Sequence, residues 1–581
     1  MTYDLIVRGG TIVDGTGRAP FRGDVAVRDG RIAAVGAPGE IAGEAAREVD
    51  ATGLVVTPGF VDVHTHYDAQ VTWDPYLTPS CFHGVTTAVL GNCGVGFAPA
   101  RPDEREWLIE LMECVEDIPR AAISAGMKWD WESFPEYLDA LERAPLAMDI
   151  ATHVPHTSLR TYVMGERGAS NEPATPADIA EMARLVKEGI AAGALGFSTS
   201  RTLAHRAPNG EPVPGTFASE DELFGIGRVL GELGTGIFEV ANNGAAGEDV
   251  EAPKAEVDWM RRLSKEIGRP VSFTMLQVDA APNLWRELLA TAKAARAEGA
   301  DLHPQIAGRP FGMLMGLQTE RHAWRGRPAF EEIAGLPLAE LAAELRTPER
   351  RRRILSEPAD TNGFGAVWVQ YDKLFPLGNP MNYEPSDEDS IAAIAKRSGR
   401  DPQEVLYDAM IAEDGRAMLL VPALNYSERS CDPIYEMMHE PQTVLGLGDG
   451  GAHCALICDA SIQTFMLTHW VRDRSRGPRL PIEFAVKRMT HDPARLYGLE
   501  DRGTLEPGMK ADLNLIDLER LALELPEAVA DLPAGARRLV QRARGYVATF
   551  VSGVETMRDD RPTGALPGAL VRGAQPAPSA A

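Results

Sequence analysis

The sequence predicts an α/β protein with a (β/α)₈ TIM-like barrel and a small β-sandwich domain built from both chain ends. Two observations lead to this prediction. Short apolar segments of strand length alternate with amphipathic segments through the middle of the chain, which is the pattern of parallel β/α units. Both ends instead consist of short predicted strands separated by glycine-containing turns. Because the two ends share this pattern, we expect them to pack together as one domain. Residues 57–500 are therefore predicted as the barrel, and residues 1–56 and 501–570 as the sandwich.

The N-terminal segment is predicted to be all β. Residues 3–8, 23–28 and 31–36 form short runs rich in Val, Ile, Leu and Ala. Asp29 and Gly30 lie between the last two runs, and an Asp-Gly pair between such runs is a strong hairpin signal.

Eight apolar segments are predicted as the barrel strands. Amphipathic segments separate most of them, such as residues 176–192, where Thr175 is a suitable N-cap and Gly193 a suitable helix end. In such barrels the functional groups lie at the carboxyl ends of the strands. The predicted strands are residues 57–66, 84–92, 148–155, 194–200, 236–242, 270–277, 301–307 and 443–450.

The connection between the seventh and eighth predicted strands is much longer than an ordinary loop. Residues 309–442 are therefore predicted as an insertion, either a lid over the barrel mouth or a lateral addition. The chain ends in residues 573–581, which are rich in Pro, Ala and Ser and are predicted to be disordered.

Composition and charge restrict the partners. The chain of 581 residues is 44% hydrophobic and 24% charged, as in ordinary globular proteins. Its formal net charge of −26 argues against nucleic acid or an anionic membrane as a partner. It has neither a signal-like N-terminus nor an apolar run of the roughly 18 residues that span a bilayer. Six cysteines do not make a disulfide framework in so long a chain. We expect a cytoplasmic protein acting on a small molecule, and a homo-oligomer stays open.

Two histidines end the first predicted barrel strand, in the segment Thr57-Pro-Gly-Phe-Val-Asp-Val-His-Thr-His66. Alternate side chains of a strand share a face, so Asp62, His64 and His66 are expected to point the same way. Paired imidazoles at the end of a buried strand suit a divalent ion, which imidazole nitrogen binds at about 2.0–2.1 Å. Cys93 and Asp449 follow the second and eighth predicted strands, so the barrel would bring them to the same end.

Motifs elsewhere in the chain accompany this segment. They are Leu5–Gly15, Gly84–Thr87, Gly91–Gly96, Pro155–Arg160, Asp492–Arg495 and Arg502–Leu513. Taken together, these motifs resemble the amidohydrolase superfamily, and the segments at 91–96 and 155–160 resemble its N-acyl-D-amino-acid deacylase (D-aminoacylase) branch. The resemblance extends over nearly the whole chain except residues 309–442.

The resemblance implies a metal-dependent hydrolase in which a divalent ion, usually Zn²⁺, polarises the scissile carbonyl. It implies that His64 and His66 are metal ligands and that Asp449 is both a ligand and the catalytic proton shuttle. In this branch it also implies that the thiolate of Cys93 takes the place of a carboxylated lysine. The fourth predicted strand, residues 194–200, contains no lysine, which is consistent with that replacement.

The sequence departs from the family pattern at the fifth and sixth strands. The family places a histidine at each of these strand ends, where this chain has Ala241 and Met275. Neither is a suitable zinc ligand, because thioether sulfur prefers softer ions. One ion on the two histidines and the aspartate is therefore expected rather than two, although replacement by oxygen ligands and the lack of a tightly bound metal stay open. The candidate replacement ligands are Glu239, Asn243 and Gln277.

Other polar residues near strand ends are candidates for substrate binding. His453 could be a ligand or a hydrogen-bond donor to a developing oxyanion, and His156 could position the substrate. A substrate carboxylate could pair with Arg160 or Arg201, of which Arg201 is preferred because it directly follows the fourth predicted strand.

We therefore expect a metal-dependent amidohydrolase that hydrolyses a C–N amide bond, with N-acyl-D-amino acids as candidate substrates. Cyclic amides, carbamates and formamides stay open as substrates, since a fold does not determine a substrate. The alternative from another class is a non-catalytic scaffold protein with the same fold, which the two missing histidines favour.

Overall fold

The central element is a curled sheet of eight parallel strands in a computed structural model that describes residues 2–359 and 364–579. Its strand order is β16-β12-β11-β10-β9-β8-β7-β6. A parallel bridge between Thr65 and Gly450 joins the two ends of this order, which confirms the predicted TIM-like barrel. The strands are β6 (Phe60–Asp62), β7 (Val85–Leu90), β8 (Asp149–Pro155), β9 (Gly196–Ser200), β10 (Ile237–Ala241), β11 (Val271–Thr274), β12 (Leu302–Ile306) and β16 (Val444–Leu445).

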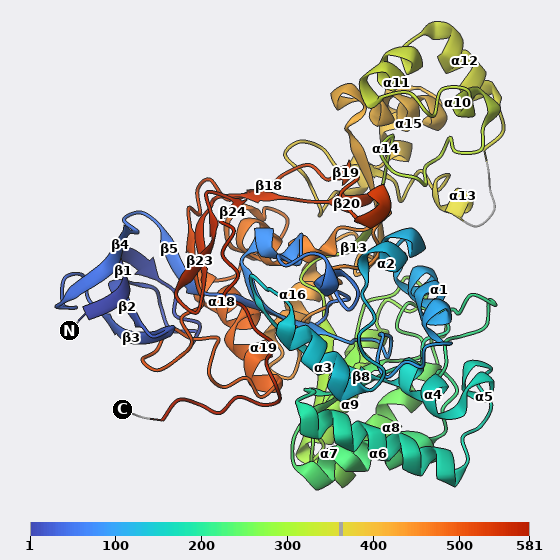
Figure 1. The fold of residues 1–581 in the computed structure, drawn as a ribbon. Helices are drawn as coiled ribbons and strands as arrows, with labels where there is room; N and C mark the ends of the chain where they lie inside the picture. Colours follow the sequence, from blue (N-terminus) through green and yellow to red (C-terminus); the bar gives the residue numbers. More distant parts are fainter. Residues whose placement is uncertain (1, 360–363, 580–581) are drawn as a thin grey trace.

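Helices follow most strands and cover the outside of the barrel (Figure 1). In α6 the side chains of Thr175 and Asp178 form a capping box and Gly193 ends the helix, as its sequence indicates. The α-helices outside residues 311–424 are α1 (Arg105–Glu116), α2 (Arg120–Gly126), α3 (Phe134–Arg143), α4 (His156–Met164), α5 (Glu166–Ala169), α6 (Pro176–Ala192), α7 (Glu220–Leu233), α8 (Ala252–Ile267), α9 (Leu284–Ala297), α16 (Asp432–His439), α17 (Ile462–Phe465), α18 (Ile482–Met489) and α19 (His491–Leu496).

A nine-stranded sheet, here called the end sheet, contains strands from both ends of the chain. Strand β5 pairs with β1 on one side and with β17 on the other, and the predicted Asp29-Gly30 turn connects β2 to β3. Leu5, Val25, Leu513 and Phe550 share its apolar core. The two layers of a sandwich stay a prediction. The strands are β1 (Thr2–Ile12), β2 (Phe21–Arg28), β3 (Arg31–Gly36), β4 (Glu44–Asp50), β5 (Val55–Pro58), β17 (Leu513–Ile516), β22 (Tyr546–Val551), β23 (Val554–Arg558) and β24 (Arg561–Pro562).

The segment predicted as the first barrel strand is divided between the two sheets. Val55–Pro58 belongs to the end sheet, and Phe60–Asp62 begins the barrel. Gly59 lies between them, where a Cβ would come within 2.1 Å of Oγ1 of Thr86. A larger residue would therefore push β6 away from β7 at this junction.

Between β12 and β16 the chain forms a three-stranded sheet in the order β13-β15-β14 and several helices. This part has a core of its own, which includes Trp324, Leu345 and Tyr407, and its helices project from the barrel (Figure 1). The elements are β13 (Phe311–Gly316), α10 (Pro328–Glu331), α11 (Leu338–Leu345), α12 (Pro348–Ser356), α13 (Phe364–Val367), β14 (Phe375–Pro376), α14 (Ile391–Ser398), α15 (Pro402–Met410) and β15 (Met418–Leu424).

The C-terminal segment runs along the barrel instead of leaving it. Backbone amides of Val571, Gly573 and Gln575 donate to the carbonyls of Ile150, Gly193 and Gly498, respectively. The predicted disorder of residues 573–581 stays a prediction, although the backbone of Gly573 and Gln575 donates to carbonyls of the barrel domain. Residues 580–581 lie outside the described residues.

Among the described residues, no helix combines the length and the apolar character needed to cross a bilayer.

Candidate active site and metal centre

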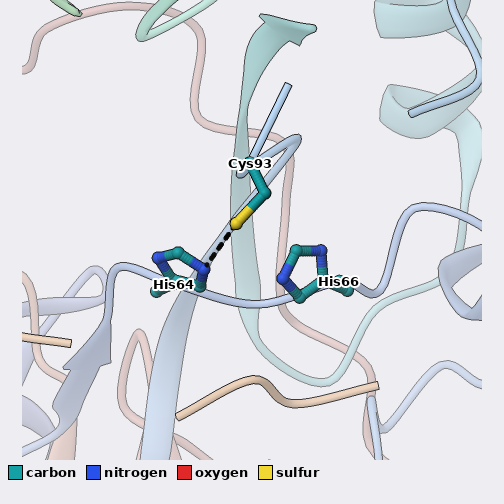
Figure 2. Close-up of side chains that lie close together, drawn as sticks. All are labelled: His64, His66 and Cys93. Atoms are coloured by element: carbon teal, nitrogen blue, oxygen red, sulfur yellow. Dashed lines mark hydrogen bonds between the residues drawn. The ribbon is translucent and has the colours of Figure 1, made fainter. Parts of the chain in front are cut away.

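Three potential metal ligands lie together at the carboxyl ends of β6 and β7. The ligand atoms of His64, His66 and Cys93 all lie within 4.8 Å of one another, and all three residues are buried. Nε2 of His64 is 3.3 Å from Sγ of Cys93 (Figure 2). The two imidazoles flank the thiol, as expected if all three side chains face one point.

Local backbone geometry aims Cys93 at the histidines. Cys93 follows β7 with a φ of 55°, and its amide donates to Oε2 of Glu239 at 3.0 Å. At Gly94 a Cβ would lie 2.6 Å from the backbone nitrogen of Ser200. Only glycine permits this close approach, so the Asn-Cys-Gly turn packs directly onto β9.

Asp449 completes the cluster from the last barrel strand. Its Oδ1 lies 3.4 Å from Nε2 of His64 and 3.8 Å from Nε2 of His66. The amide of Asp449 donates to the carbonyl of His64 at 3.1 Å, which ties the end of β16 to the end of β6. The four residues that the sequence singles out as ligands therefore lie side by side.

Neighbouring side chains orient the two imidazoles. Nδ1 of His64 donates to Oε1 of Gln305 at 2.8 Å, which leaves Nε2 as the nitrogen facing the cluster. Nδ1 of His66 lies 3.4 Å from Oε1 of Glu116. A hydrogen-bonded oxygen such as that of Gln305 holds a metal-binding histidine in the required tautomer, whereas Glu116 faces His66 at ion-pair distance without a hydrogen bond.

Glu116 is a site residue that the sequence reasoning missed. It lies on α1, between the second and third barrel strands, and not at a strand end. Leu108, Met112 and Glu116 are spaced by four residues and all are buried, so Glu116 is an acidic residue on the apolar stripe of its helix. An acidic residue on the apolar face of a predicted helix is the sequence signal that could have identified Glu116.

Burial dominates the electrostatics of the cluster. It raises the pKa of Asp449 to about 6 and that of Glu239 to about 8, and it raises the pKa of Glu116 well above its ordinary value. Burial also raises the pKa of the Cys93 thiol, and the nearby carboxyl of Glu239 raises this pKa further. It lowers the pKa of His64 to about 4. Buried acids and neutral imidazoles together favour a bound cation.

The donor atoms fit one divalent ion. In tetrahedral zinc sites, neighbouring nitrogen, oxygen and sulfur ligands lie about 3.3–3.6 Å apart, given the usual bond lengths. The distances of 3.3, 3.4 and 3.8 Å between these donors are close to that range. Nδ1 of His66 and one carboxylate oxygen each of Glu116 and Glu239 are buried without a hydrogen-bond partner, which a cation nearby would compensate.

The cluster forms one wall of a cavity of about 270 Å³ at the barrel mouth. That size accommodates a small molecule. Besides the four ligand candidates, the cavity is lined by Glu116, Thr202, Ala204, His205, Ala241, Ala245, Ala246, Thr274, Leu276, Phe311, Gly312, Met313, Ala423, Leu424, Leu447, His453 and Ile457.

Of the candidate replacement ligands, Glu239 is the one that contacts the cluster, through the amide of Cys93. Ala241 lines the cavity and Met275 is buried beside it in the barrel core. Gln277 instead bonds to Asn425 and Glu428, and Asn243 is not among the residues that line the cavity. The structure thus brings neither Gln277 nor Asn243 to the cluster.

The predicted substrate-binding arginines do not line this cavity. Arg201 pairs with Glu256 at 3.0 Å, and Arg160 is fully buried and pairs with Glu222 at 2.9 Å. His156 lies between Glu222 and Thr199. Each of these side chains is held by a carboxylate on a flanking helix, and none lines the cavity.

His453 does line the cavity, and its Nε2 lies 3.9 Å from Oε2 of Glu116. A further histidine, His205, lines the same cavity and was not predicted. Its Nδ1 lies 2.9 Å from Oγ of Ser200, so Nε2 remains available for contact with a ligand.

Comparison with known proteins identifies the family of the chain. The model of the amidohydrolase family matches residues 47–557. The chain is 29% identical to a D-aminoacylase of Alcaligenes xylosoxydans xylosoxydans over 97% of its own length and 96% of that protein's. A crystal structure of D-aminoacylase is similar with a TM-score of 0.64 and 25% identity, covering 98% of this chain and 100% of that one. The N-acyl-D-glutamate deacylase of Bordetella bronchiseptica, complexed with zinc and a phosphonate inhibitor, has the same fold, with a TM-score of 0.63, 24% identity and coverages of 98% and 100%.

Proposed function

The chain belongs to the amidohydrolase family, and from that premise we propose that it hydrolyses an amide bond with one divalent ion. As a member of the family it is a hydrolase of carbon–nitrogen bonds other than peptide bonds. The ion would lie where β6, β7 and β16 end, and Zn²⁺ suits the mixed nitrogen, sulfur and oxygen donors. The residues that would hold it are His64, His66, Cys93 and Asp449.

One observation carries the proposal. The ligand atoms of His64, His66 and Cys93 lie within 4.8 Å of one another, and Oδ1 of Asp449 lies 3.4 and 3.8 Å from the two histidines, although these residues come from the first, second and last barrel strands. A scaffold without catalysis has no physical need for this arrangement, because burying unpaired donors destabilises a fold. The non-catalytic alternative is therefore not favoured.

A bound divalent ion supplies Lewis acidity toward the scissile carbonyl and the attacking water. Asp449 accepts the proton of the attacking water and then passes it to the leaving nitrogen. His453 faces the same cavity and donates a hydrogen bond to the oxyanion that develops on the carbonyl oxygen. Gln305 and Glu116 are positioning residues, because they act through His64 and His66.

The absence of the histidines at the fifth and sixth strands limits the site to one ion. Ala241 offers no ligand atom, and the thioether of Met275 is a poor match for zinc. N-acyl-D-amino acids are the substrates that the names of the relatives suggest. Cyclic amides, carbamates and formamides are the other amide-like candidates for the same chemistry.

The proposal is tested by zinc content and turnover of variants. Cys93→Ser is expected to lose most of the bound zinc, since a hydroxyl is a much weaker zinc ligand than a thiolate. Cys114→Ser is the matched control, because Cys114 is an exposed cysteine on α1. Zinc that stays stoichiometric in Cys93→Ser would refute the ligand assignment.

Asp449→Asn separates binding from proton transfer. We expect this variant to fold and to lose about 10²–10⁴-fold in kcat on a panel of amides, since an amide cannot accept the proton. Asp473→Asn, on the exposed surface, is expected to keep normal turnover. Normal turnover of Asp449→Asn would rule out the proposed role of Asp449.

We also propose a two-layered sandwich for residues 1–56 and 501–570, because Leu5 and Ile6 face separate apolar clusters. A cytoplasmic location and assembly into a homo-oligomer are proposed on the basis of sequence alone. Sedimentation of the purified protein tests the assembly.

A further inference from the structure

The cavity is lined by two kinds of side chain. The metal-binding candidates, Glu116, His205 and His453 supply polar groups, and a set of apolar side chains, here called the apolar wall, lines much of the rest. Phe311 and Met313 come from β13 and Leu424 from β15, so the insertion supplies much of the apolar wall. Figure 1 shows β13 at the base of the projecting part, next to the barrel. Leu276 and Ile457 extend this wall.

No cationic side chain faces this cavity. Of the described residues that line it, none is a lysine or an arginine. Arg160 and Arg201 were the predicted partners of a substrate carboxylate. They form ion pairs with Glu222 and Glu256 instead.

A carboxylate beside the scissile bond would be poorly accommodated here. It would lose its water against an apolar wall without gaining a lysine or arginine partner of its own, and a buried charge without such a partner is strongly unfavourable. Glu116, Asp449 and Glu239 already place acidic groups around the cluster. The net charge of −26 further opposes the approach of an anion.

We propose that this site takes a neutral amide with an apolar substituent, an N-acylated amine without a carboxylate next to the nitrogen. This inference rests on the proposed function, because it concerns the same site. In the reaction, water oxygen bonds to the acyl carbon, the C–N bond breaks, and the nitrogen leaves as an amine with a proton from water. The products are a carboxylic acid and an apolar amine, whose substituent packs against Phe311, Met313 and Leu424.

A matched substrate pair tests the proposal with the zinc-loaded full chain. N-acetyl-2-phenylethylamine and N-acetyl-D-phenylalanine share the acyl group and the aromatic ring and differ by the carboxylate. We expect kcat/KM to be at least about 100-fold higher for the neutral compound, as for sites that leave a substrate's polar group unpaired. Equal values, or a preference for the acid, would overturn the proposal.

A charge placed in the apolar wall should change this preference. Met313→Arg puts a guanidinium at a half-buried position of the wall, and we expect it to reduce the preference for the neutral compound at least tenfold. Val554→Arg adds the same charge at an exposed position of the end sheet, outside the cavity, and should leave the preference unchanged. An unchanged preference in Met313→Arg would contradict the proposed substrate class.

Binding measurements distinguish this inference from the proposed function. Calorimetry with the same two compounds reports affinity whether or not hydrolysis occurs. If neither compound is hydrolysed but the neutral one binds more tightly, the substrate class stands and the hydrolytic function fails. If the acid binds more tightly, the substrate class is refuted even when hydrolysis is observed.

Discussion

Glu116 connects two of the histidines of the site through one buried carboxyl group. Its oxygens lie 3.4 Å from Nδ1 of His66 and 3.9 Å from Nε2 of His453. Glu116→Gln should weaken zinc binding about 10–100-fold, because an amide cannot become an anionic partner of His66 when a cation binds beside it. Competition with a chelating dye measures this change without any need for turnover.

Glu113 provides the matched control on the same helix. It is exposed, three residues before Glu116, and its side chain accepts from the amide of Arg120. Glu113→Gln should therefore bind zinc like the natural protein. If Glu116→Gln also binds zinc with unchanged affinity, the positioning role of Glu116 is wrong.

The residues of the site could be predicted only where a strand end carries them. His64, His66, Cys93 and Asp449 follow apolar strands, and the barrel brings such positions together. Glu116 comes from a helix, and no local pattern relates it to a strand end. The pairing of Arg160 and Arg201 with Glu222 and Glu256 could not be predicted, because those partners lie on helices whose packing the sequence does not display.

At the level of elements, a buried ion pair joins the barrel to the segment that leads into the end sheet. Arg502 pairs with Asp149 at the start of β8 at 2.7 Å and donates to Thr87 in β7 at 3.0 Å. Lys510 also approaches Asp149, at 3.1 Å. Arg502→Met should lower the free energy of unfolding by about 3 kcal/mol, because it leaves a buried carboxylate with one partner fewer. Denaturant titration measures this loss.

An exposed ion pair gives the comparison. Arg184 pairs with Glu181 and Glu188 on the surface of α6, so Arg184→Met should cost less than about 1 kcal/mol. A loss in Arg502→Met no larger than in Arg184→Met would show that this junction does not hold the elements together.

Acid should reduce the difference between Arg502→Met and the natural protein. Burial raises the pKa of Asp149, but the charges of Lys510 and Arg502 outweigh it and hold the pKa below its ordinary value. A carboxyl with a lowered folded pKa stabilises the fold above its unfolded pKa of about 3.9. That contribution disappears as the pH falls through the lower folded value. Denaturant unfolding between pH 7 and pH 3 should therefore show the difference in unfolding free energy between Arg502→Met and the natural protein decreasing below about pH 4.

The elements themselves could be predicted better than their pairing. All eight predicted barrel segments contain a barrel strand, because short apolar runs between turns are distinctive. The run at 57–66 was read as one strand, yet β5 and β6 divide near Gly59 between two sheets. Which sheet a strand joins depends on distant partners such as β17, which follows hundreds of residues later. Local pattern does not contain that information.

For the whole molecule, the metal candidates include residues from both the first and the last strand of the barrel. The Thr65–Gly450 bridge closes the barrel at this point, and His64 and Asp449 lie beside it. An ion bound here would therefore act as a second closure of the barrel, in addition to the backbone bridge. Binding to the folded state alone stabilises that state in proportion to the logarithm of ligand concentration.

Zinc should protect the barrel and not the end sheet. At free zinc of one hundred times Kd, the linkage predicts about 2.7 kcal/mol of added stability. Hydrogen exchange should slow at the amides of Thr65, His66 and Asp449 and be unchanged in β22, which lies outside the barrel. A chelator should reverse the protection, and Cys93→Ser should abolish it while Cys114→Ser retains it. Equal protection of β22, or none at the closure, would show that the ion does not link the first strand to the last.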